Sequence, residues 1–540
     1  MIQHKCLIIA IVMMLSSMTI GTCFSVTDQA GVTNLPTKKE MNYLISGSDP
    51  QEEWNKTYGG NKWDECSAVE VTIDGGYIFA GTKNANGYDT DGDCWLVKTD
   101  SYGNVLWEKI FGGQGSDTGT DLCKTSDGGY AIVGYTRTFG AGGLDVYLIK
   151  TDATGNEQWN KTFGGQQDDH GLAIQQCSDN GFIIAGATQS YGPSKAWLLK
   201  TDAVGTLQWE KRFSTRGYFM TLLRTAEDEY VAAGRDYIDD TSEIIIVKTD
   251  RFGTVIWEKL LGNPTCKDSA LGIAATSDGN YILTGQVEHP ETNCDIVLMK
   301  IDNDGDELWT RTFNETVFFD TGLSVKETSD GGFLIAGEVG TNLDNPVLFD
   351  AILIKTDSNG MKEWSMIYEK AGSESFYEAL QTEDEEYIAG GFTTSSGAGS
   401  QDAWLVKISA FENQRPNTPL RPSGPSSGKI NQELTFTVST TDPDGDQLFY
   451  LFDFGDGVTS FWYGPYDSGE ECSASHIWFE KGNYQVKVKA QDCHGAESDW
   501  SDPLPITMPY TYKPPLLQLL ELLFQRFPNA FPILRHLLGY

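Results

Sequence analysis

Basic residues are scarce in this chain: of its 540 residues, 39 are Lys or Arg and 76 are Asp or Glu. The formal net charge of −37 repels phosphate backbones and anionic lipid, and no run of Lys or Arg offsets it locally. The composition therefore excludes nucleic acid as an expected partner. It also excludes a coiled coil, a collagen-like fibre and a disordered polymer, because 39% of the residues are apolar and only 19 are Pro.

The N-terminal segment has the composition of an export signal. Lys5 is its one charged group, an apolar stretch runs from Leu7 to Leu15, and small and polar residues follow around Gly21 to Ser25. We predict a signal peptide over residues 1–25, which is too short to span a membrane as a mature helix. The run from Ile20 to Cys23 keeps a lipoprotein-type signal open as an alternative.

Cysteines are few, and none are adjacent or spaced as Cys-x-x-Cys. Loss of the signal would remove Cys6 and Cys23 and leave eight, and an even count in an exported protein favours disulfides over metal-thiolate sites. Zinc is therefore not expected. We predict the pairs Cys66–Cys94 and Cys266–Cys294, each 28 residues apart, and Cys472–Cys493, whereas Cys123 and Cys177 are expected to be buried thiols.

The strongest pattern is internal repetition. A Trp recurs at positions 54, 107, 159, 209, 257, 309 and 364, and a Lys-Thr-Asp triplet or a near variant keeps step with it, starting at 98, 150, 200, 248, 300, 355 and 407. Each unit of roughly 50 residues contains four short apolar or alternating runs bounded by Gly-containing turns. Seven such units predict an all-β fold, a seven-bladed β-propeller over residues 50–410.

The phase of the repeat predicts how the ring closes. The segment Trp54 to Tyr58 precedes the first complete unit, and the last unit stops at Ser409 without a Trp segment of its own. If each blade ends with its Trp strand, the N-terminal segment supplies the missing strand of the last blade. Pairing between the two ends then removes exposed sheet edges.

The repeated Asp-x-x-Gly-x-x-x-Trp turn, for example Asp100 to Trp107, resembles the repeats of quinoprotein-like propellers and the Asp-box of sialidase propellers. Both resemblances imply a fold and transfer no chemistry. A quinoprotein would carry a vicinal cysteine pair, and a sialidase would place a cluster of arginines around the axis. Neither feature is present in the repeats.

Residues 411–430 have the composition of a linker, and residues 431–509 resemble a PKD domain, an immunoglobulin-like β-sandwich. The resemblance rests on Asp442 to Asp446, the Asp453-Phe-Gly-Asp-Gly457 motif and the alternation from Tyr484 to Asp492. Phe452 and Trp478 depart from the usual aromatic types, which affects the expected packing and not the fold.

The C-terminal tail, residues 510–540, is strongly apolar but is broken by Pro528 and Pro532 and carries charges. It resembles the tails of archaeal exported PKD-domain proteins. A short helix docked on the protein is one interpretation. A segment for sorting, assembly or attachment to a membrane surface is the other.

Acidic residues recur on one face of the predicted ring. Ahead of the innermost strands stand Asp64, Asp117, Asp168, Asp268 and Asp320, and five residues before most Lys-Thr-Asp triplets stands another acid. Hard oxygen ligands suit Ca²⁺, so one interpretation is a set of calcium sites or an acidic mouth, and the other is that each Asp caps a strand. Asp442, Asp444 and Asp446 give a second calcium hypothesis, at a domain junction, and the alternative for this run is a plain turn.

No catalytic constellation is apparent, because the histidines are scattered and lack a Ser or Cys partner at a defined spacing. We expect a secreted or cell-surface protein that binds or adheres without catalysis, with the variable face of the propeller contacting a protein or glycan and the PKD domain as spacer or second contact. The alternatives are a hydrolase or lyase with acids at the channel mouth and a structural component of a cell envelope. Asn55, Asn160 and Asn314 lie in glycosylation sequons.

Overall fold

The computed structural model describes residues 50–85, 91–213, 216–238, 241–289, 293–316, 318–341, 348–410, 414–493, 495–508 and 515–526. The predicted signal peptide and most of the C-terminal tail lie outside the described residues. Within them, the chain forms strands and one helix.

The first 28 strands build the repeat region. Their bounds, in chain order, are β1 Glu52–Tyr58, β2 Trp63–Val71, β3 Tyr77–Ala85, β4 Asp93–Thr99, β5 Val105–Phe111, β6 Asp117–Lys124, β7 Tyr130–Thr136, β8 Asp145–Thr151, β9 Glu157–Phe163, β10 Asp169–Gln176, β11 Phe182–Thr188, β12 Lys195–Thr201, β13 Leu207–Arg212, β14 Gly217–Arg224, β15 Tyr230–Ile238, β16 Thr241–Thr249, β17 Val255–Leu261, β18 Ser269–Ala275, β19 Tyr281–His289, β20 Asn293–Ile301, β21 Glu307–Phe313, β22 Asp320–Glu327, β23 Phe333–Gly340, β24 Phe349–Thr356, β25 Lys362–Tyr368, β26 Glu374–Gln381, β27 Tyr387–Thr393 and β28 Asp402–Ile408.

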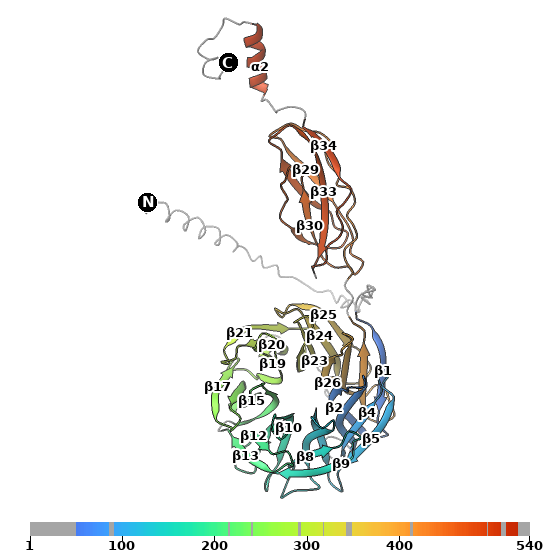
Figure 1. The fold of residues 1–540 in the computed structure, drawn as a ribbon, viewed down its shortest axis with the longest axis vertical. Helices are drawn as coiled ribbons and strands as arrows, with labels where there is room; N and C mark the ends of the chain where they lie inside the picture. Colours follow the sequence, from blue (N-terminus) through green and yellow to red (C-terminus); the bar gives the residue numbers. More distant parts are fainter. Residues whose placement is uncertain are drawn as a thin grey trace, which may run out of the picture. The chain divides into compact units, whose positions relative to one another are not determined.

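These strands form seven four-stranded antiparallel sheets, and Figure 1 shows the sheets arranged around a central opening. Blade 1 is β2–β5, and blades 2 to 6 follow with four consecutive strands each. In blade 7 the order is β1-β28-β27-β26, and Trp54 to Tyr58 of β1 pair with Lys407 to Ala403 of β28. The predicted seven-bladed propeller and its closure by the N-terminal strand are both confirmed.

The repeated Asp-x-x-Gly-x-x-x-Trp motif joins each blade to the next. Asp100 accepts hydrogen bonds from the backbone N–H groups of Tyr102 and Asn104, and Gly103 adopts a φ of 73°, which favours glycine. A Cβ on Gly103 would lie 2.9 Å from the indole of Trp54 on the preceding blade. The Trp of one blade therefore packs on the glycine turn of the next.

The lysine of each Lys-Thr-Asp triplet or variant forms an ion pair inside its own blade. The pairs are Lys98–Asp74, Lys150–Asp127, Lys200–Asp179, Lys248–Glu229, Lys300–Asp278, Lys355–Asp330 and Lys407–Glu386, at 2.6–2.9 Å. In each case the acid lies in the turn that connects the first two strands of the blade. Both recurring motifs therefore have a structural role.

The predicted disulfide Cys66–Cys94 is wrong. Cys66 on β2 pairs with Gly81 of β3, and Cys94 on β4 pairs with Thr82 of the same strand, so a whole strand separates them. Strands two apart lie about 9.6 Å from each other, beyond the Cα separation of a disulfide. The two thiols also point to opposite faces of the sheet, because Cys66 packs on Gly390 of blade 7 and Cys94 on Gly119 of blade 2.

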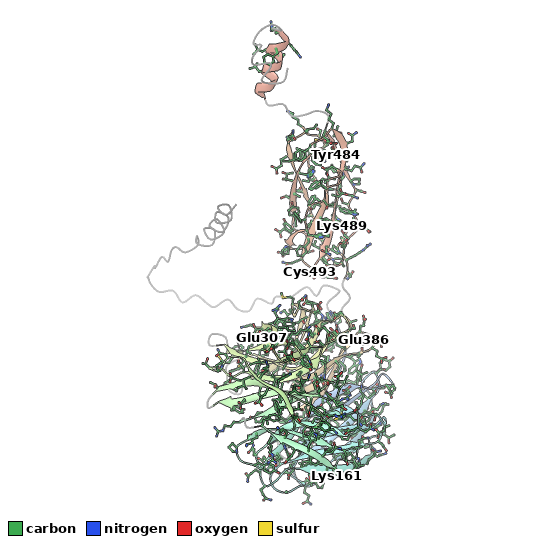
Figure 2. The ribbon with its side chains drawn as sticks, turned by 60° about the vertical axis from the view of Figure 1, so that its left-hand side comes forward. Lys161, Glu307, Glu386, Tyr484, Lys489 and Cys493 are labelled. Atoms are coloured by element: carbon green, nitrogen blue, oxygen red, sulfur yellow. The ribbon has the colours of Figure 1, made fainter. Side chains whose placement is uncertain are left out.

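The other predicted disulfides are also absent from the described residues, whose cysteines are all reduced. Cys266 precedes β18 and Cys294 lies in β20, and both are buried thiols. Cys472 is buried on β32, whereas the exposed Cys493 follows β33 in the other sheet of the sandwich, as Figure 2 shows for Cys493. Cys177 is a buried thiol as predicted, and Cys123 is partly buried.

The second part of the chain is a β-sandwich. Its strands are β29 Glu433–Val438, β30 Leu448–Asp453, β31 Tyr463–Tyr466, β32 Cys472–Ile477, β33 Gly482–Asp492 and β34 Leu504–Met508. One sheet pairs β29 with β32, and the other has the order β31-β30-β33-β34. Its core includes Phe436, Phe452 and Trp478, so the two exchanged aromatic residues are buried.

The segment predicted as a linker is partly integrated into the sandwich. Ser423 exchanges backbone hydrogen bonds with Thr437 at 2.9 Å, and Ile430 belongs to the core. The sandwich therefore includes residues before the predicted boundary at 431. Helix α2, Pro515–Arg526, is the one described element of the tail, and no described helix is long and apolar enough to cross a membrane.

Candidate functional site

The two faces of the ring differ in how much their loops vary. On one face, the turns after the first strand of each blade close with the same backbone hydrogen bond, for example from Thr72 to Gly76 and from Thr382 to Glu386. On the other face, the connection between the second and third strands ranges from two residues between β15 and β16 to eight between β7 and β8. Variable loops on a constant scaffold are typical of a binding face.

The recurring acids at the start of the innermost strands hold these variable loops. Asp64 accepts hydrogen bonds from Gly60 N–H and Asn84 N–H, both at 2.7 Å, and so connects the loop from the preceding outer strand to the end of the second strand of its blade. Asp117 accepts from Gly113 N–H at 2.9 Å and from the hydroxyls of Thr138, at 2.6 Å, and Thr136. Asp268 and Asp320 likewise accept backbone N–H groups.

The structure does not bring the five predicted ring acids together, because each belongs to a different blade. In blade 3 the equivalent residue is Asp169, which accepts Gly165 N–H at 2.8 Å, and not the predicted Asp168. Asp168 lies one residue earlier and accepts Leu144 N–H at 2.9 Å. Blade 4 has Gly217 at this position and blade 7 has Glu374, which accepts the Thr393 hydroxyl at 2.7 Å.

Asp117→Ala should destabilise the ring by about 3 kcal/mol, because it leaves several loop donors without an acceptor in a buried site. Asp168→Ala is the matched control and should cost less than about 1 kcal/mol, since Asp168 is only partly buried. Denaturant unfolding with and without calcium measures both. If Asp117 bound calcium instead, added calcium would stabilise the wild type and not the variant.

The repetition ends one residue further along each innermost strand. There the side chain and its register partner on the second strand of the blade differ from blade to blade. We call these seven register pairs the mouth belt: Glu65/Thr82, Thr118/Tyr135, His170/Ala187, Tyr218/Arg235, Ser269/Gln286, Thr321/Glu338 and Ser375/Phe392. Because the innermost strands begin on the variable face, the mouth belt lies where the central channel opens onto that face.

Contacts within the mouth belt run from one blade to the next. The Tyr135 ring lies 4.9 Å from the His170 ring, and the Thr321 hydroxyl donates to Gln286 Oε1 at 3.2 Å. Burial raises the pKa of Glu338, and the nearby Ser375 hydroxyl of the next blade acts in the opposite direction. Each of these contacts joins the second strand of one blade to the innermost strand of the following blade.

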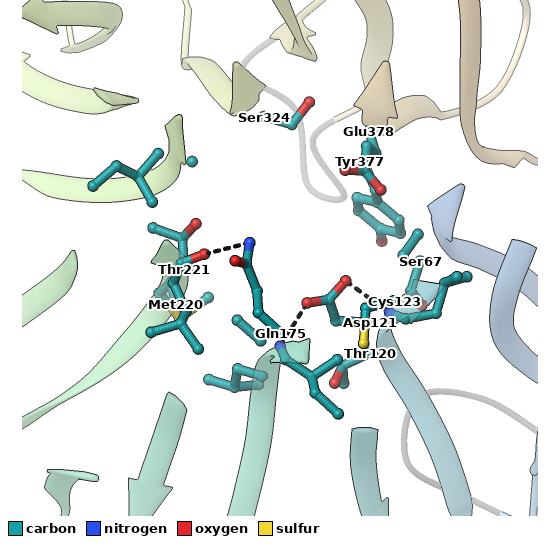
Figure 3. Close-up of a pocket in the computed structure, with 18 of the residues that line it drawn as sticks. Ser67, Thr120, Asp121, Cys123, Gln175, Met220, Thr221, Ser324, Tyr377 and Glu378 are labelled. Atoms are coloured by element: carbon teal, nitrogen blue, oxygen red, sulfur yellow. Dashed lines mark hydrogen bonds between the residues drawn. The ribbon is translucent and has the colours of Figure 1, made fainter. Parts of the chain in front are cut away.

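Below the mouth belt the channel encloses a cavity of about 440 Å³. All seven innermost strands contribute to its lining, and each carries a β-bulge there, as at Ser67, Thr120 and Tyr377. Figure 3 shows Asp121 and Gln175 reaching into this opening, with Glu378 and Ser324 on the other side of it. Hydrogen bonds link neighbouring strands here, including Ile174 N–H to Asp121 at 2.7 Å and Val69 N–H to Glu378 at 3.0 Å.

The cavity contains a mixed charge cluster. Lys326 pairs with Glu378 at 2.9 Å, and Lys124 pairs with Glu70 at 3.1 Å. Burial, followed by repulsion from Glu378, raises the pKa of Asp121 to about 7, although two backbone N–H groups and Lys326 act in the opposite direction. Burial also raises the pKa of Glu70. This group of carboxylates was not predicted: Asp121 and Glu378 share one position of the repeat, directly after the bulge, but the other five blades carry no acid there.

The raised pKa of Asp121 should be visible in the pH dependence of stability. The folded chain binds this proton more tightly than the unfolded chain, whose Asp titrates near 3.9, so Asp121 destabilises the fold progressively as the pH rises from about 4 to 7. Between pH 5 and pH 8 the free energy of unfolding should fall in both proteins, but by about 1 kcal/mol less in Asp121→Asn than in the wild type. This value takes into account that solvent in the channel screens the charge. Parallel profiles of the two proteins in denaturant unfolding would contradict this.

The sandwich has a separate acidic group. Ligand atoms of Asp442, Asp446 and Asp492 all lie within 4.8 Å of one another, and one carboxylate oxygen of the buried Asp442 has no hydrogen-bond partner. Asp444, predicted with the first two, instead accepts Gln414 N–H at 2.6 Å. Asp492 was missed because it lies 46 residues beyond Asp446, at the end of β33. Two ring segments, Asp89 to Asp93 and Asp302 to Asp306, resemble the start of a calcium loop in sequence but lack its Glu at the twelfth position. Asp302 to Asp306 form an ordinary repeat turn, and Asp89 lies outside the described residues.

Comparison with known proteins identifies the sandwich. Residues 418–502 match the family model of the PKD domain. Collagenase ColA of Bacillus cereus is 33% identical over 92 residues, which are 17% of this chain and 9% of that protein. Regulatory protein FlaEY of Caulobacter vibrioides is 27% identical over 125 residues, 20% of this chain and 13% of that protein. The chain thus spans well under a fifth of the length of these curated relatives.

Among solved structures, the PKD domain of an M14-like peptidase from a Thermoplasmatales archaeon is 46% identical, covers 18% of this chain and 99% of its own, and gives a TM-score of 0.17. Xylan β-1,4-xylosidase from Bacillus halodurans is 11% identical, covers 85% of this chain and 92% of its own, and gives a TM-score of 0.29. At this level of similarity, neither structure indicates an activity for the propeller of this chain.

Proposed function

We propose that this protein is an exported or cell-surface binding protein whose mouth belt recognises a glycan. The observation behind the proposal is the loss of repetition at the mouth belt. One residue before it, five of the seven blades carry Asp and blade 7 carries Glu, whereas the mouth belt combines aromatic, acidic, amide, hydroxyl and basic side chains. A repeated scaffold that differs at one ring of positions is suited to one asymmetric ligand.

The accessible members of the mouth belt favour a sugar over a flat protein surface. His170, Tyr218 and Phe392 supply partly exposed rings, and Glu65 and Gln286 supply partly exposed hydrogen-bonding groups. Aromatic residues in loops of the same face extend this surface, since Phe139 and Phe319 are each 41% exposed. Rings combined with a small number of polar groups are typical of concave ligand sites. The PKD domain then acts as a spacer or a second contact.

A glycan array probed with the full chain tests the proposal. We expect selective binding to a small set of glycans, and loss of that binding in the double variant Tyr218→Ala/Phe392→Ala. The matched control is Tyr102→Ala, which removes an aromatic residue that is 71% exposed at a turn on the constant face. If the chain bound a protein partner and no glycan, the glycan proposal would be wrong and the ligand of the mouth belt would be a protein.

A hydrolase or lyase is the second candidate, and the raised pKa of Asp121 favours it. A carboxyl group that titrates near neutral pH beside other carboxylates has the properties of a general acid. Release of reducing ends or of unsaturated products from a bound glycan, abolished by Asp121→Asn with binding retained, would support catalysis. Binding without turnover in both proteins would support the binding function.

We also propose that Asp442, Asp446 and Asp492 bind calcium, since oxygen ligands from three carboxylates suit this ion. Calcium should raise the unfolding temperature of the sandwich in the wild type and not in Asp492→Asn. Magnesium serves as the control ion, because it demands a smaller octahedral site. Equal effects of calcium on both proteins would reject the site.

A further inference from the structure

The mouth belt contains one basic residue, Arg235, and its surroundings are unusual for an arginine. It lies on β15 in blade 4 and is partly buried. Among the described residues no carboxylate forms an ion pair with it, although the chain has 76 acids. A guanidinium with a buried N–H group is normally paired, so an arginine without an ion pair in so acidic a protein requires an explanation.

The hydrogen bonds of Arg235 are also incomplete. A guanidinium has five N–H donors. Within the described part of the chain Arg235 makes one side-chain hydrogen bond, from Nη1 to the Tyr237 hydroxyl at 3.3 Å, and its buried Nε has no acceptor. The planar group is held in place by aromatic rings, since its Cζ lies 6.0 Å from the Tyr218 centroid and 5.5 Å from the Tyr237 centroid.

One further hydroxyl without a hydrogen-bond partner belongs to the same blade junction. In the pattern of the mouth belt, Arg235 on the second strand of blade 4 faces Ser269 on the innermost strand of blade 5, as Tyr135 faces His170. The Ser269 hydroxyl is fully buried and has no hydrogen-bond partner. The Tyr218 and Tyr237 hydroxyls lie 2.6 Å apart beside the arginine. The unpartnered Arg235 Nε and the unpartnered Ser269 hydroxyl thus belong to the same blade junction, which lacks an acceptor for them.

We propose that the junction of blades 4 and 5 in the mouth belt binds the carboxylate of an acidic sugar residue, with Arg235 as its partner. This inference rests on the glycan-binding function proposed above and adds the class of sugar. A planar carboxylate matches the fork of a guanidinium and accepts two parallel hydrogen bonds. The negative charge of the protein as a whole is screened beyond about 8 Å at physiological salt, so the local cation dominates at contact.

Two acids lie one register position from Arg235, and strand alternation turns their side chains to the opposite face of the sheet. Asp236 and Glu243 are register partners on β15 and β16, and burial, with repulsion from Glu243, raises the pKa of Asp236. Neither forms an ion pair with Arg235, and a raised pKa weakens the repulsion that Asp236 exerts on an incoming anion. The Coulombic effect of Arg235 on Tyr218 opposes the burial that raises the pKa of that tyrosine to about 12.

The test uses matched oligosaccharides on the full chain. The probes are a panel of uronic-acid oligosaccharides, each paired with its methyl ester, together with sulfated and neutral oligosaccharides. By titration calorimetry in 0.15 M salt, we expect at least one acid to bind at least about tenfold more tightly than its ester, because the ester removes the negative charge and leaves the sugar unchanged.

Variants assign the effect to one residue. Arg235→Met should weaken binding of the acid at least about tenfold and leave binding of the ester unchanged, and Arg235→Lys should restore part of the affinity. The matched control is Arg212→Met, since Arg212 also stacks on a tyrosine, at 3.7 Å from the Tyr191 centroid, but is paired with Glu210. Unfolding temperatures check that each variant is folded.

Several outcomes would overturn the inference. Equal affinity for acid and ester, an unchanged affinity in Arg235→Met, or binding of sulfated but not carboxylated sugars would each reject a carboxylate site. Binding of neutral glycans alone would reject it as well and leave the proposed glycan-binding function intact. Absence of binding to every glycan would instead reject that function.

Discussion

A chain that lacks residues 1–59 will unfold at a temperature at least about 10 °C lower than the full chain, because blade 7 loses its outer strand. Strand β1 buries Tyr58 and part of Trp54 against neighbouring blades, and Glu53 pairs with Lys407 at 3.0 Å. Loss of these contacts should lower the free energy of unfolding by about 5 kcal/mol, because two large side chains are no longer buried and one ion pair is lost. It also leaves β28 as an unpaired sheet edge. Calorimetry measures the transition.

The control for this truncation is a chain that lacks residues 1–48, which keeps all of β1 and should unfold at the temperature of the full chain. A peptide of residues 50–59, added at high concentration to the truncated chain, should restore part of the lost stability. If the truncated chain unfolded at the unchanged temperature, closure of the ring by β1 would not contribute to stability.

Lys355→Met should destabilise the ring by about 3 kcal/mol. Lys355 is 2% exposed and contacts Asp330 at 2.7 Å and Glu363 at 2.9 Å, so its removal leaves two carboxylates without their cation. This loss of stability is small for the breaking of a buried ion pair, because the Asp330 side chain is 54% exposed. Denaturant unfolding at pH 7 measures it.

The same variant should be less sensitive to acid. Lys355 contributes to holding the pKa of Asp330 below its usual value, so this stabilisation is present above about pH 4, the unfolded value, and is lost as the pH falls below it. The wild type should therefore lose more stability than Lys355→Met below pH 4. Lys161→Met is the control, since Lys161 is exposed on the outer strand of blade 2 (Figure 2) and should change stability by less than about 0.5 kcal/mol.

The fold could be predicted because its signals are repeated. The spacing of Trp54, Trp107 and their equivalents marks every blade, and the early Trp54 marks the strand exchanged at closure. Seven copies of one pattern average out local ambiguity. The disulfide predictions were wrong because they rested on a single spacing and not on a repeated pattern. The 28 residues between Cys66 and Cys94 do not reveal that a strand lies between the two thiols.

The candidate site could be predicted only in part. The variable face could be predicted from the loop lengths. The acids on it, such as Asp64 and Asp117, recur because they accept hydrogen bonds that hold the loops of their blades. The mouth belt gives no pattern in the sequence, since its members are defined by differing from one another. That Arg235 and Ser269 belong to the same blade junction follows only once the register of two adjacent blades is known.

Hydrogen exchange of the full chain with and without a bound glycan is the most direct test of the central claim that the mouth belt is the binding site. We predict that the ligand slows exchange at the starts of the innermost strands and in the variable loops, including residues 217–219 and 235–237. Slower exchange confined to the uniform turns on the opposite face, around the exposed Ile73 and Phe252, or confined to the PKD domain, would contradict this account.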